Sequence, residues 1–281
     1  MKQKAVVAII LCACLAGLSG VMIKSMESLT ASTIAWMRMT IPSTLLAIWM
    51  LAKGVRFFRG NAKIMVLASS LNAVRMYLYF FAFIYTSIGN AIILFYSWPI
   101  FTAIFGYLFL KERFNARQWF FLIMAFTGLI IAYSDKTFSF EDSDLIGMIA
   151  ALAGACIYSI TVIIFKSETN NYHRNEILFY QNFVGPFLFL PFFIQQVPSA
   201  EMPDIYLLIF YSIFIGLGVF SLFFYGLHYL KASVASSMMY LEIVSALLSG
   251  YLVLGEKLSV NMIIGGIFII ISSFMISRLV K

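Results

Sequence analysis

Three ionisable side chains stand inside long apolar stretches of the sequence, namely Arg38, Arg75 and Glu242. Glu242 is near the middle of residues 233–256, which are otherwise almost wholly apolar. A helix needs about 20 such residues to cross a bilayer. A charge that faces lipid there costs about 2.5–3.5 kcal/mol, so we expect all three side chains to face protein or a water-filled cavity. A direct pair between Glu242 and one arginine is a hypothesis. The alternative is that Glu242 is a protonated or hydrogen-bonded structural group.

Helical spacing gathers further polar groups beside these charges. Asn72, Arg75 and Tyr79 recur at i, i+3 and i+7 and therefore share one face of a helix. Glu242 and Ser245 share a face in the same way. A face that mixes charge, amide, hydroxyl and aromatic ring predicts a binding cavity for a small organic solute. Both signs of charge favour a zwitterionic or mixed-charge metabolite over a simple ion.

Three more polar residues of later apolar stretches, Tyr158, Tyr180 and Asn182, are candidate binding residues. A tyrosine in a membrane helix also serves as an interface anchor or a packing group. An asparagine there can simply form a hydrogen bond between helices. Both alternatives stay open for these three positions.

The elements that must position these residues are ten apolar segments. The chain of 281 residues is 62% hydrophobic and 11% charged, whereas about a quarter of the residues of a soluble protein are charged. The segments leave only short connections, so the sequence predicts an all-α integral membrane protein with ten transmembrane helices and no separate soluble domain. The predicted spans are 5–23, 30–52, 62–85, 88–110, 116–134, 145–165, 175–194, 204–229, 232–254 and 260–279.

The distribution of the net charge of +7 indicates orientation. With the N-terminus inside, three basic residues lie in outer segments: Lys24, Lys136 and Lys257. The positive-inside rule then places both termini in the cytoplasm, and the basicity is not a nucleic-acid surface. Residues 1–17 also resemble a signal peptide, whose cleavage would leave nine spans, but nine further spans favour an uncleaved first helix. The inner segments hold 14 basic residues: Lys2, Lys4, Lys53, Arg56, Arg59, Lys63, Lys111, Arg113, Arg117, Lys166, Arg174, Lys231, Arg278 and Lys281.

An internal repeat at an offset of 144 residues organises the chain. Near its start the register slips by two, so that Lys24 matches Lys166. Each half is a five-helix unit, residues 1–135 and residues 144–281, joined by the acidic stretch 135–144. Because five is odd, the second unit enters the membrane from the opposite side, as in many secondary transporters. The pairs that carry the repeat include Pro42 with Pro186, Tyr85 with Tyr229, Tyr96 with Tyr240, Gly106 with Gly250 and Glu112 with Glu256.

The two halves differ in their polar content. The repeat mate of Glu242 is Trp98, which is also a candidate binding residue, and that of Arg38 is Asn182, so the predicted site is asymmetric. Pro99 lacks an N–H group and predicts a kink in the fourth span, which is either a hinge or a static bend. We expect this proline kink in the fourth span only.

Two stretches resemble the EamA-like branch of the drug/metabolite transporter superfamily. They are SWPIFTAIFGYLFLKERF at 97–114 and LEIVSALLSGYLVLGEKL at 241–258. Both are similar to the family pattern, in which an early Pro or Glu-Pro is followed by small residues, a Gly and an acidic residue just after the helix ends. Arg38 matches a basic position of the family, while Ile243 departs from the frequent Glu-Pro. The resemblance implies a protein of the bacterial inner membrane with two five-helix repeats and both termini in the cytoplasm. It also implies transport of amino acids, related metabolites or drugs.

The resemblance also leaves a narrower substrate open. One branch of the superfamily handles S-adenosylmethionine, and residues 240–242 are similar to that branch. The principal hypothesis is a secondary transporter that binds a small solute between the repeats and opens alternately to each side. No GxxxxGK[ST] loop is present, so an ion gradient or solute exchange must drive it. Glu242 is the candidate for proton coupling.

Other classes of protein fit the sequence less well. A membrane enzyme would need a nucleophile, a base or a metal set at depth, but the two histidines are His173 and His228, in a loop and near a span end. A channel would favour rings of like charge or a carbonyl filter. Cys12 and Cys14 form a Cys-x-Cys pair without a nearby His, so we expect no metal and no cofactor. The partners expected are the solute and the lipid bilayer, and the sequence does not define an oligomeric state.

Overall fold

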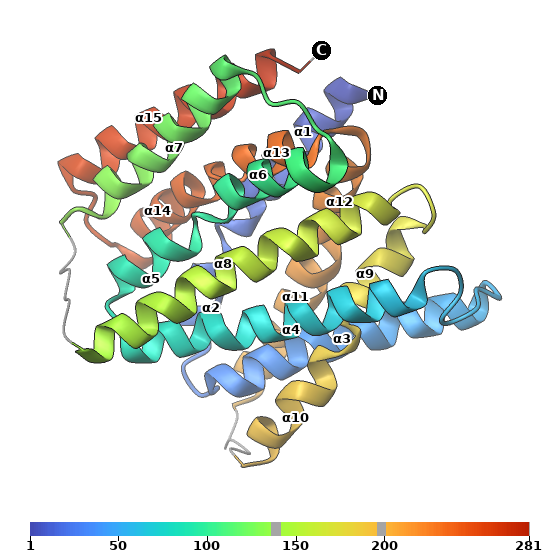
Figure 1. Cartoon of the computed structure of the whole chain (residues 1–281). Helices are drawn as coiled ribbons and strands as arrows, with labels where there is room; N and C mark the ends of the chain where they lie inside the picture. The colour runs from blue at the N-terminus through green and yellow to red at the C-terminus, as the bar shows by residue number, and fades with distance from the viewer. Residues whose placement is uncertain (136–141, 196–200, 281) are drawn as a thin grey trace.

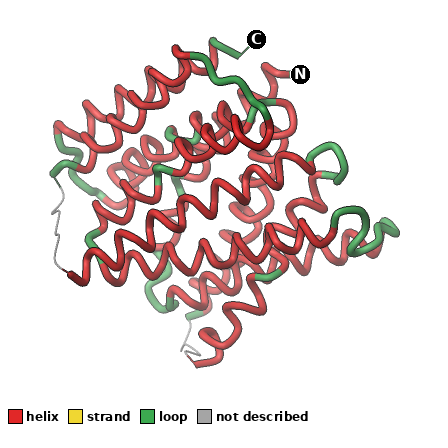
Figure 2. The backbone as a smooth tube through the Cα atoms, in the orientation of Figure 1, coloured by secondary structure: helices red, strands yellow, loops and turns green. Residues whose placement is uncertain are grey.

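The computed structural model describes residues 1–135, 142–195 and 201–280, and these ranges are helical with short connections (Figures 1 and 2). Ten segments in these ranges are long and apolar enough to cross a membrane. The helices are α1 (Lys2–Ala16), α2 (Ser19–Lys24), α3 (Ala31–Ala52), α4 (Ala62–Tyr85), α5 (Ile88–Phe95), α6 (Trp98–Leu110), α7 (Ala116–Tyr133), α8 (Asp142–Glu168), α9 (Arg174–Phe183), α10 (Gly185–Gln195), α11 (Met202–Ile213), η1 (Phe214–Val219), α12 (Phe220–Tyr229), α13 (Ala232–Met238), α14 (Leu241–Leu254) and α15 (Val260–Arg278).

The ten predicted spans are confirmed. The third, fourth and ninth agree to the residue with the observed segments Ala62–Tyr85, Ile88–Leu110 and Ala232–Leu254. Helices dominate because lipid offers no partner to the backbone, which must form its hydrogen bonds within each span. The predicted link at 135–144 falls largely on residues 136–141, outside the described ranges.

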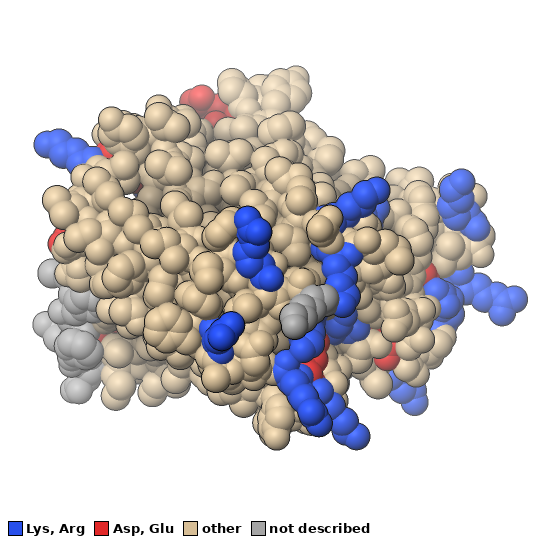
Figure 3. All heavy atoms as spheres, turned by 90° about the horizontal axis from the view of Figure 1, so that it is seen from above, with Lys and Arg blue, Asp and Glu red and all other residues tan. Residues whose placement is uncertain are grey.

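The helices form two inverted five-span repeats, α1–α7 and α8–α15. One end of the bundle holds both termini and the α3–α4 and α8–α9 connections (Figure 1), and we call it the basic face because of the Lys and Arg residues of these segments. Figure 3 shows Lys and Arg side chains gathered over the centre and right of the view. The last helices of the two repeats, α7 and α15, pack along each other. A Cβ on Gly128 would lie 2.7 Å from the Gly265 carbonyl oxygen, so this close approach requires glycine.

The middle of the fourth span is interrupted between α5 and α6, and Pro99 lies in the first turn of α6. The ninth span is interrupted at the equivalent place, between α13 and α14, although Ile243 replaces the proline there. The proline at a break is thus found in the fourth span and not in the ninth, while the break in the ninth span was not predicted. The two breaks support each other, because the Tyr240 hydroxyl donates a hydrogen bond of 2.8 Å to the Tyr96 carbonyl oxygen. This contact replaces a partner that the backbone loses at the break.

A π-helical turn, η1, lies within the eighth span beside α3. A Cβ on its Gly216 would lie 2.5 Å from Cγ of Pro42 and 3.4 Å from the carbonyl oxygen of Arg38. Such turns occur as single bulges inside α-helices, frequently at functional sites. The turn brings the following helix, α12, close to the segment of α3 that carries Arg38.

Candidate solute-binding site

Arg75 lies on α4 in the interior of the bundle. Its Nη2 donates a hydrogen bond of 2.8 Å to Oδ1 of Asn72, whose own Nδ2 donates to the Gln181 carbonyl oxygen at 2.8 Å. The guanidinium lies over the ring of Tyr158, 4.4 Å from its centroid. Its Nε is buried and has no hydrogen-bond partner in the described ranges. Arg75 is therefore held in place by an amide and a π face and keeps an unused donor.

Aromatic rings form the wall around Arg75. The Tyr158 ring meets Trp98 edge-on at 4.8 Å between centroids, and the Tyr79 ring lies 4.6 Å from Phe95. Trp98 is 3% exposed. The hydroxyl of Ser159 donates to the Trp98 carbonyl oxygen at 2.7 Å, which fixes α8 against the start of α6. The predicted residues Asn72, Arg75, Tyr79, Trp98 and Tyr158 therefore come together.

Glu242 approaches this group from α14. It lies in the first turn of that helix, where the partial positive charge of the helix N-terminus stabilises a carboxylate. The hydroxyl of Tyr96 is within hydrogen-bonding reach of its carboxylate, and Arg38 and Arg75 are close enough to interact with it electrostatically. Arg38 lies over the Phe220 ring at 5.4 Å and has Sδ of Met76 at 3.6 Å from its Nη1.

The hypothesised direct pair between Glu242 and an arginine is not formed. Among the described residues, the side-chain ion pairs with an N···O distance of 4.0 Å or less are Lys24–Glu256 and Arg59–Glu176. Arg38, Arg75 and Glu242 instead share one interior region, and the space between the charges is not closed by a salt bridge. We call these three residues, with Asn72, Tyr79, Tyr96, Trp98 and Tyr158, the central cluster.

Three predicted site residues lie elsewhere or use their polar groups locally. Asn182 donates to the Leu178 carbonyl oxygen of its own helix at 2.9 Å. Ser245 donates to the Cys14 carbonyl oxygen of α1 at 2.5 Å. Tyr180 packs edge-on against Tyr172, near the α3–α4 connection. The polar groups of Asn182 and Ser245 therefore serve helix contacts, whereas the buried Tyr180 hydroxyl has no hydrogen-bond partner in the described ranges.

The neighbours of Tyr180 form a small loop cluster on the basic face. Nε of Arg59 donates to Oε1 of Glu176 at 2.7 Å, and its Nη2 donates to Oε2 at 2.7 Å. This bidentate contact raises the pKa of the Arg59 guanidinium. The Tyr172 hydroxyl donates to the Arg59 carbonyl oxygen at 2.5 Å. The cluster ties the α3–α4 connection to the start of α9.

Tyr96, Phe95 and Phe220 belong to the central site but were not predicted from helical spacing. Tyr96 reaches Glu242 only because both spans are interrupted at the same depth, which a regular helix would not allow. The one sequence signal for it is the repeat, since Tyr96 and Tyr240 are mates in the same two breaks.

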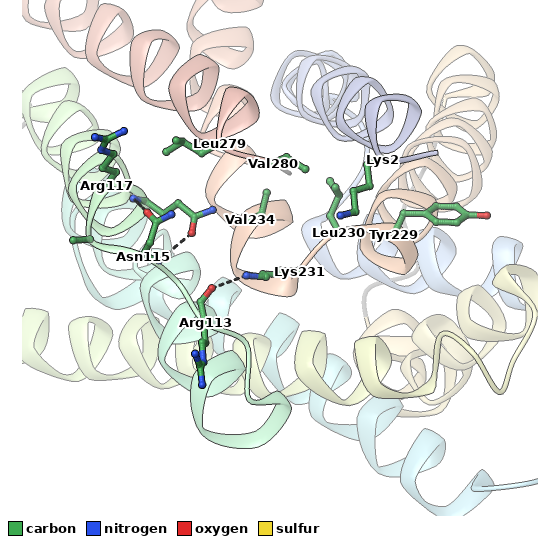
Figure 4. Close-up of a pocket in the computed structure, with 12 residues that line it drawn as sticks. Lys2, Arg113, Asn115, Arg117, Tyr229, Leu230, Lys231, Val234, Leu279 and Val280 are labelled. Carbon is green, nitrogen blue, oxygen red and sulfur yellow. Dashed lines mark hydrogen bonds between the residues drawn. The ribbon is translucent and has the colours of Figure 1, made fainter.

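Two cavities lie outside the central cluster. A cavity of about 710 Å³ on the basic face is lined by Lys2, Arg113, Arg117 and Lys231 among others (Figure 4). An apolar cavity of about 400 Å³ lies between α14 and α1 and includes Ser245 in its lining. Within the described ranges no group of three or more His, Cys, Asp and Glu side chains could hold a metal ion.

The fold and the central cluster define a ten-span membrane protein with a polar interior between two inverted repeats. A model of the EamA-like transporter family matches residues 3–134 and 145–278. The chain belongs to this family, in agreement with the resemblance of its two helix-exit motifs. The family is one of transporters, and no enzyme family is indicated.

Relatives and a solved structure agree with this assignment. The chain is 26% identical over 191 residues to the uncharacterized transporter YoaV of Bacillus subtilis, covering 66% of this chain and 65% of the relative; it thus spans slightly less than two thirds of that relative. It is 25% identical over 263 residues to the pseudopaline exporter CntI of Pseudomonas aeruginosa, covering 90% and 88%. A crystal structure of 17% identity has a TM-score of 0.83 over 99% of both chains, and shows the fold alone.

Proposed function

We propose that the protein is a secondary transporter that carries a small amino-acid-like solute across the bacterial inner membrane by alternating access. The observation that carries the proposal is the arrangement of charge in the central cluster. Arg38, Arg75 and Glu242 share the interior without an ion pair among them, and Nε of Arg75 is buried without a partner. Ionisable groups at membrane depth mark solute or ion pathways.

The cluster matches the two ends of an amino-acid-like solute. A carboxylate accepts two parallel hydrogen bonds from a guanidinium, and Arg75 has the unused donor for this contact. An ammonium group of the solute pairs with the Glu242 carboxylate. The two arginines outnumber the one acid, so a solute with more than one carboxylate also fits.

The repeats are the bodies that move in this proposal, residues 1–135 against residues 144–281. The basic face is the cytoplasmic one, as the positive-inside rule requires. Glu242 exchanges the coupling proton, because it is the acid of the central cluster. Pro99 and the two helix breaks supply the hinge.

The relatives suggest a direction of transport. A relative that covers 90% of this chain is named as a pseudopaline exporter, so export is the favoured direction. Uptake or exchange of an S-adenosylmethionine-type metabolite is the second candidate. Flux measured from both sides of the membrane distinguishes them.

The test is a ligand-stabilisation screen of the purified chain, followed by flux in proteoliposomes. We expect zwitterionic and multi-carboxylate metabolites to raise the melting temperature, and saturable flux of the same solutes. Arg75→Gln removes a charged donor worth about 1.5–3 kcal/mol, so the affinity falls about 10- to 100-fold. Arg56→Gln, which changes an exposed loop arginine, is the matched control. Equal affinity of Arg75→Gln and the parent would overturn this assignment of the site.

A further inference from the structure

An acidic residue follows the interrupted span of each repeat, Glu112 in the first and Glu256 in the second, and the two have the same backbone geometry. α6 ends at Lys111 with φ of 54°, and the N–H of Glu112 donates to the Gly106 carbonyl oxygen at 3.0 Å. α14 ends at Gly255 with φ of 67°, and the N–H of Glu256 donates to the Gly250 carbonyl oxygen at 3.1 Å. Any difference between the two carboxylates therefore comes from their surroundings.

Glu112 crosses to the other repeat. It is 9% exposed, and its Oε1 accepts a hydrogen bond of 2.8 Å from the N–H of Ala232. Its Oε2 accepts from the N–H and the hydroxyl of Ser233, at 3.2 Å and 3.0 Å. Glu112 thus caps the N-terminus of α13, where the first amides of a helix lack partners and carry partial positive charge.

Two lysines reinforce the basic face, Lys231 between the repeats and Lys166 within the second repeat. Lys231 donates to the Arg113 carbonyl oxygen at 2.6 Å (Figure 4). Lys166 donates to the carbonyl oxygens of Leu227 and His228 at 2.6 Å and 3.1 Å, at the C-terminal end of α12. An ammonium group is favourable there because the last carbonyls of a helix carry partial negative charge. The repeats are therefore tied together at this face.

The equivalent groups at the opposite face are not tied in this way. The Glu256 side chain is 49% exposed and pairs with Lys24, the repeat mate of Lys166. In the described ranges no hydrogen bond joins Glu256 to Ile88 or Gly89, the mates of Ala232 and Ser233. α6 packs along α13, whereas α14 and α5 make at most isolated contacts. The carboxylate cap therefore joins the repeats at the basic face, whereas the opposite face is bridged by the exposed Lys24–Glu256 pair and by the Ser28 hydroxyl, which donates to Asp204 at 2.6 Å.

We infer that Glu112 and Glu256 form a gate latch that is exchanged between the two faces. In the second state Glu256 caps α5 at the amides of Ile88 and Gly89, and Lys24 binds the carbonyl oxygens of Phe83 and Ile84. Glu112 then leaves α13 and pairs with Lys166, as Glu256 now pairs with Lys24. This inference rests on the proposed alternating access. It gives a physical role to the acidic residues that follow the two helices, Glu112 and Glu256.

The latch is unequal in strength. Ser233 gives Glu112 a hydroxyl donor, but its mate Gly89 has no side chain to offer Glu256. The second state therefore has one hydrogen bond fewer, and the resting protein keeps its basic face closed.

Distances between spin labels test the exchange in the full chain, after Cys12, Cys14 and Cys156 have been replaced by Ala. Labels on Tyr85→Cys and Leu252→Cys span the opposite face. Labels on their repeat mates, Tyr229→Cys and Leu108→Cys, span the basic face. In Glu112→Gln we expect the basic-face distance to gain a longer component and the opposite-face distance to gain a shorter one. Adding Glu256→Gln weakens the second state too and restores the parent distributions.

Ser233→Ala gives an independent readout if Glu112→Gln folds poorly. It removes one of the three capping bonds, so we expect a smaller shift in the same direction. Glu201→Gln, which changes an exposed acid, is the control and leaves both distances unchanged. Unchanged distances in both Glu112→Gln and Ser233→Ala overturn the latch, as does a double variant that behaves like Glu112→Gln alone. Flux is measured on the same samples. If the parent shows flux but the label distances do not change in the variants, the latch alone is refuted. If the label distances change but the parent shows no flux, the transport function alone is refuted.

Discussion

The break in the fourth span and the break in the ninth have the same place in their repeats but different side-chain partners. Tyr240 uses its hydroxyl on the backbone of the other break, at the Tyr96 carbonyl oxygen. Its mate Tyr96 instead has its hydroxyl close enough to the Glu242 carboxylate to interact with it electrostatically. Two residues after Tyr96, Trp98 forms part of the aromatic wall. Its repeat mate Glu242, two residues after Tyr240, is the acidic residue of the central cluster. The comparison shows that the repeat sets the backbone, and that individual side chains set the chemistry.

The same division extends along α4. Asn72, Arg75 and Tyr79 have Gly216, Val219 and Phe223 as mates in the second repeat. The first repeat therefore supplies both cations of the central cluster and most of its aromatic wall. The second supplies the acid and Tyr158. Under the proposed transport, a solute bound between these two halves would contact unlike surfaces, so its two ends would be distinguished while the moving frame stays symmetric.

The strongest test of this division is Glu242→Gln. The amide keeps the shape of the side chain but cannot exchange a proton, so we expect proton-driven flux to fall about tenfold or more, equivalent to 1.4 kcal/mol. Solute exchange without a proton gradient should continue. Flux in proteoliposomes with and without a pH gradient measures both.

The matched control for that variant is Glu27→Gln, which changes an exposed acid outside the central cluster. Proton-driven flux of Glu242→Gln that equals the flux of this control would rule out Glu242 as the coupling group. The different side chains at the two breaks would then matter for packing alone.

Tyr96 and Tyr240 occupy equivalent positions in the two repeats, and replacing either by Phe removes only one hydroxyl group. Tyr240→Phe leaves the Tyr96 carbonyl oxygen without its partner, and we expect a loss of stability of about 0.6–1.7 kcal/mol with solute affinity unchanged. Tyr96→Phe removes the hydroxyl beside Glu242, so we expect altered affinity or pH dependence of flux and little loss of stability. Thermal unfolding and ligand titration measure the two effects. If both variants affect stability and affinity alike, the two tyrosines do not have separate roles.

The fold followed closely from the sequence, while the site followed in part. The spans were predictable because hydrocarbon demands about 20 apolar residues per crossing, and the inversion because each repeat holds an odd number of spans. Charge at depth predicted that Arg38, Arg75 and Glu242 face the interior. Helical spacing, however, defines a face and not the neighbour that the face meets.

Ser245 illustrates that limit. It shares a helix face with Glu242, but the packing of α1 against α14 places the Cys14 carbonyl oxygen next to its hydroxyl. Tyr96 illustrates the opposite case, since an irregular backbone brings it to Glu242 without any regular spacing. The break in the ninth span has no proline signal, so its position was not predictable from local sequence.

The smallest expected effect is that of Ser245→Ala. A hydrogen bond between helices in a membrane contributes about 0.6 kcal/mol on average and about 1.7 kcal/mol at most, so stability should fall by no more than this amount. Solute affinity should stay within about twofold of the parent, because the hydroxyl contacts α1 and not the central cluster. Melting temperature and ligand titration are the measurements, and Ser249→Ala, which loses a similar contact to the Gly17 carbonyl oxygen, is the matched variant. A large loss of affinity in Ser245→Ala alone would mean that this face of α14 turns toward the solute during transport, and that the second repeat supplies more of the site than Glu242 and Tyr158.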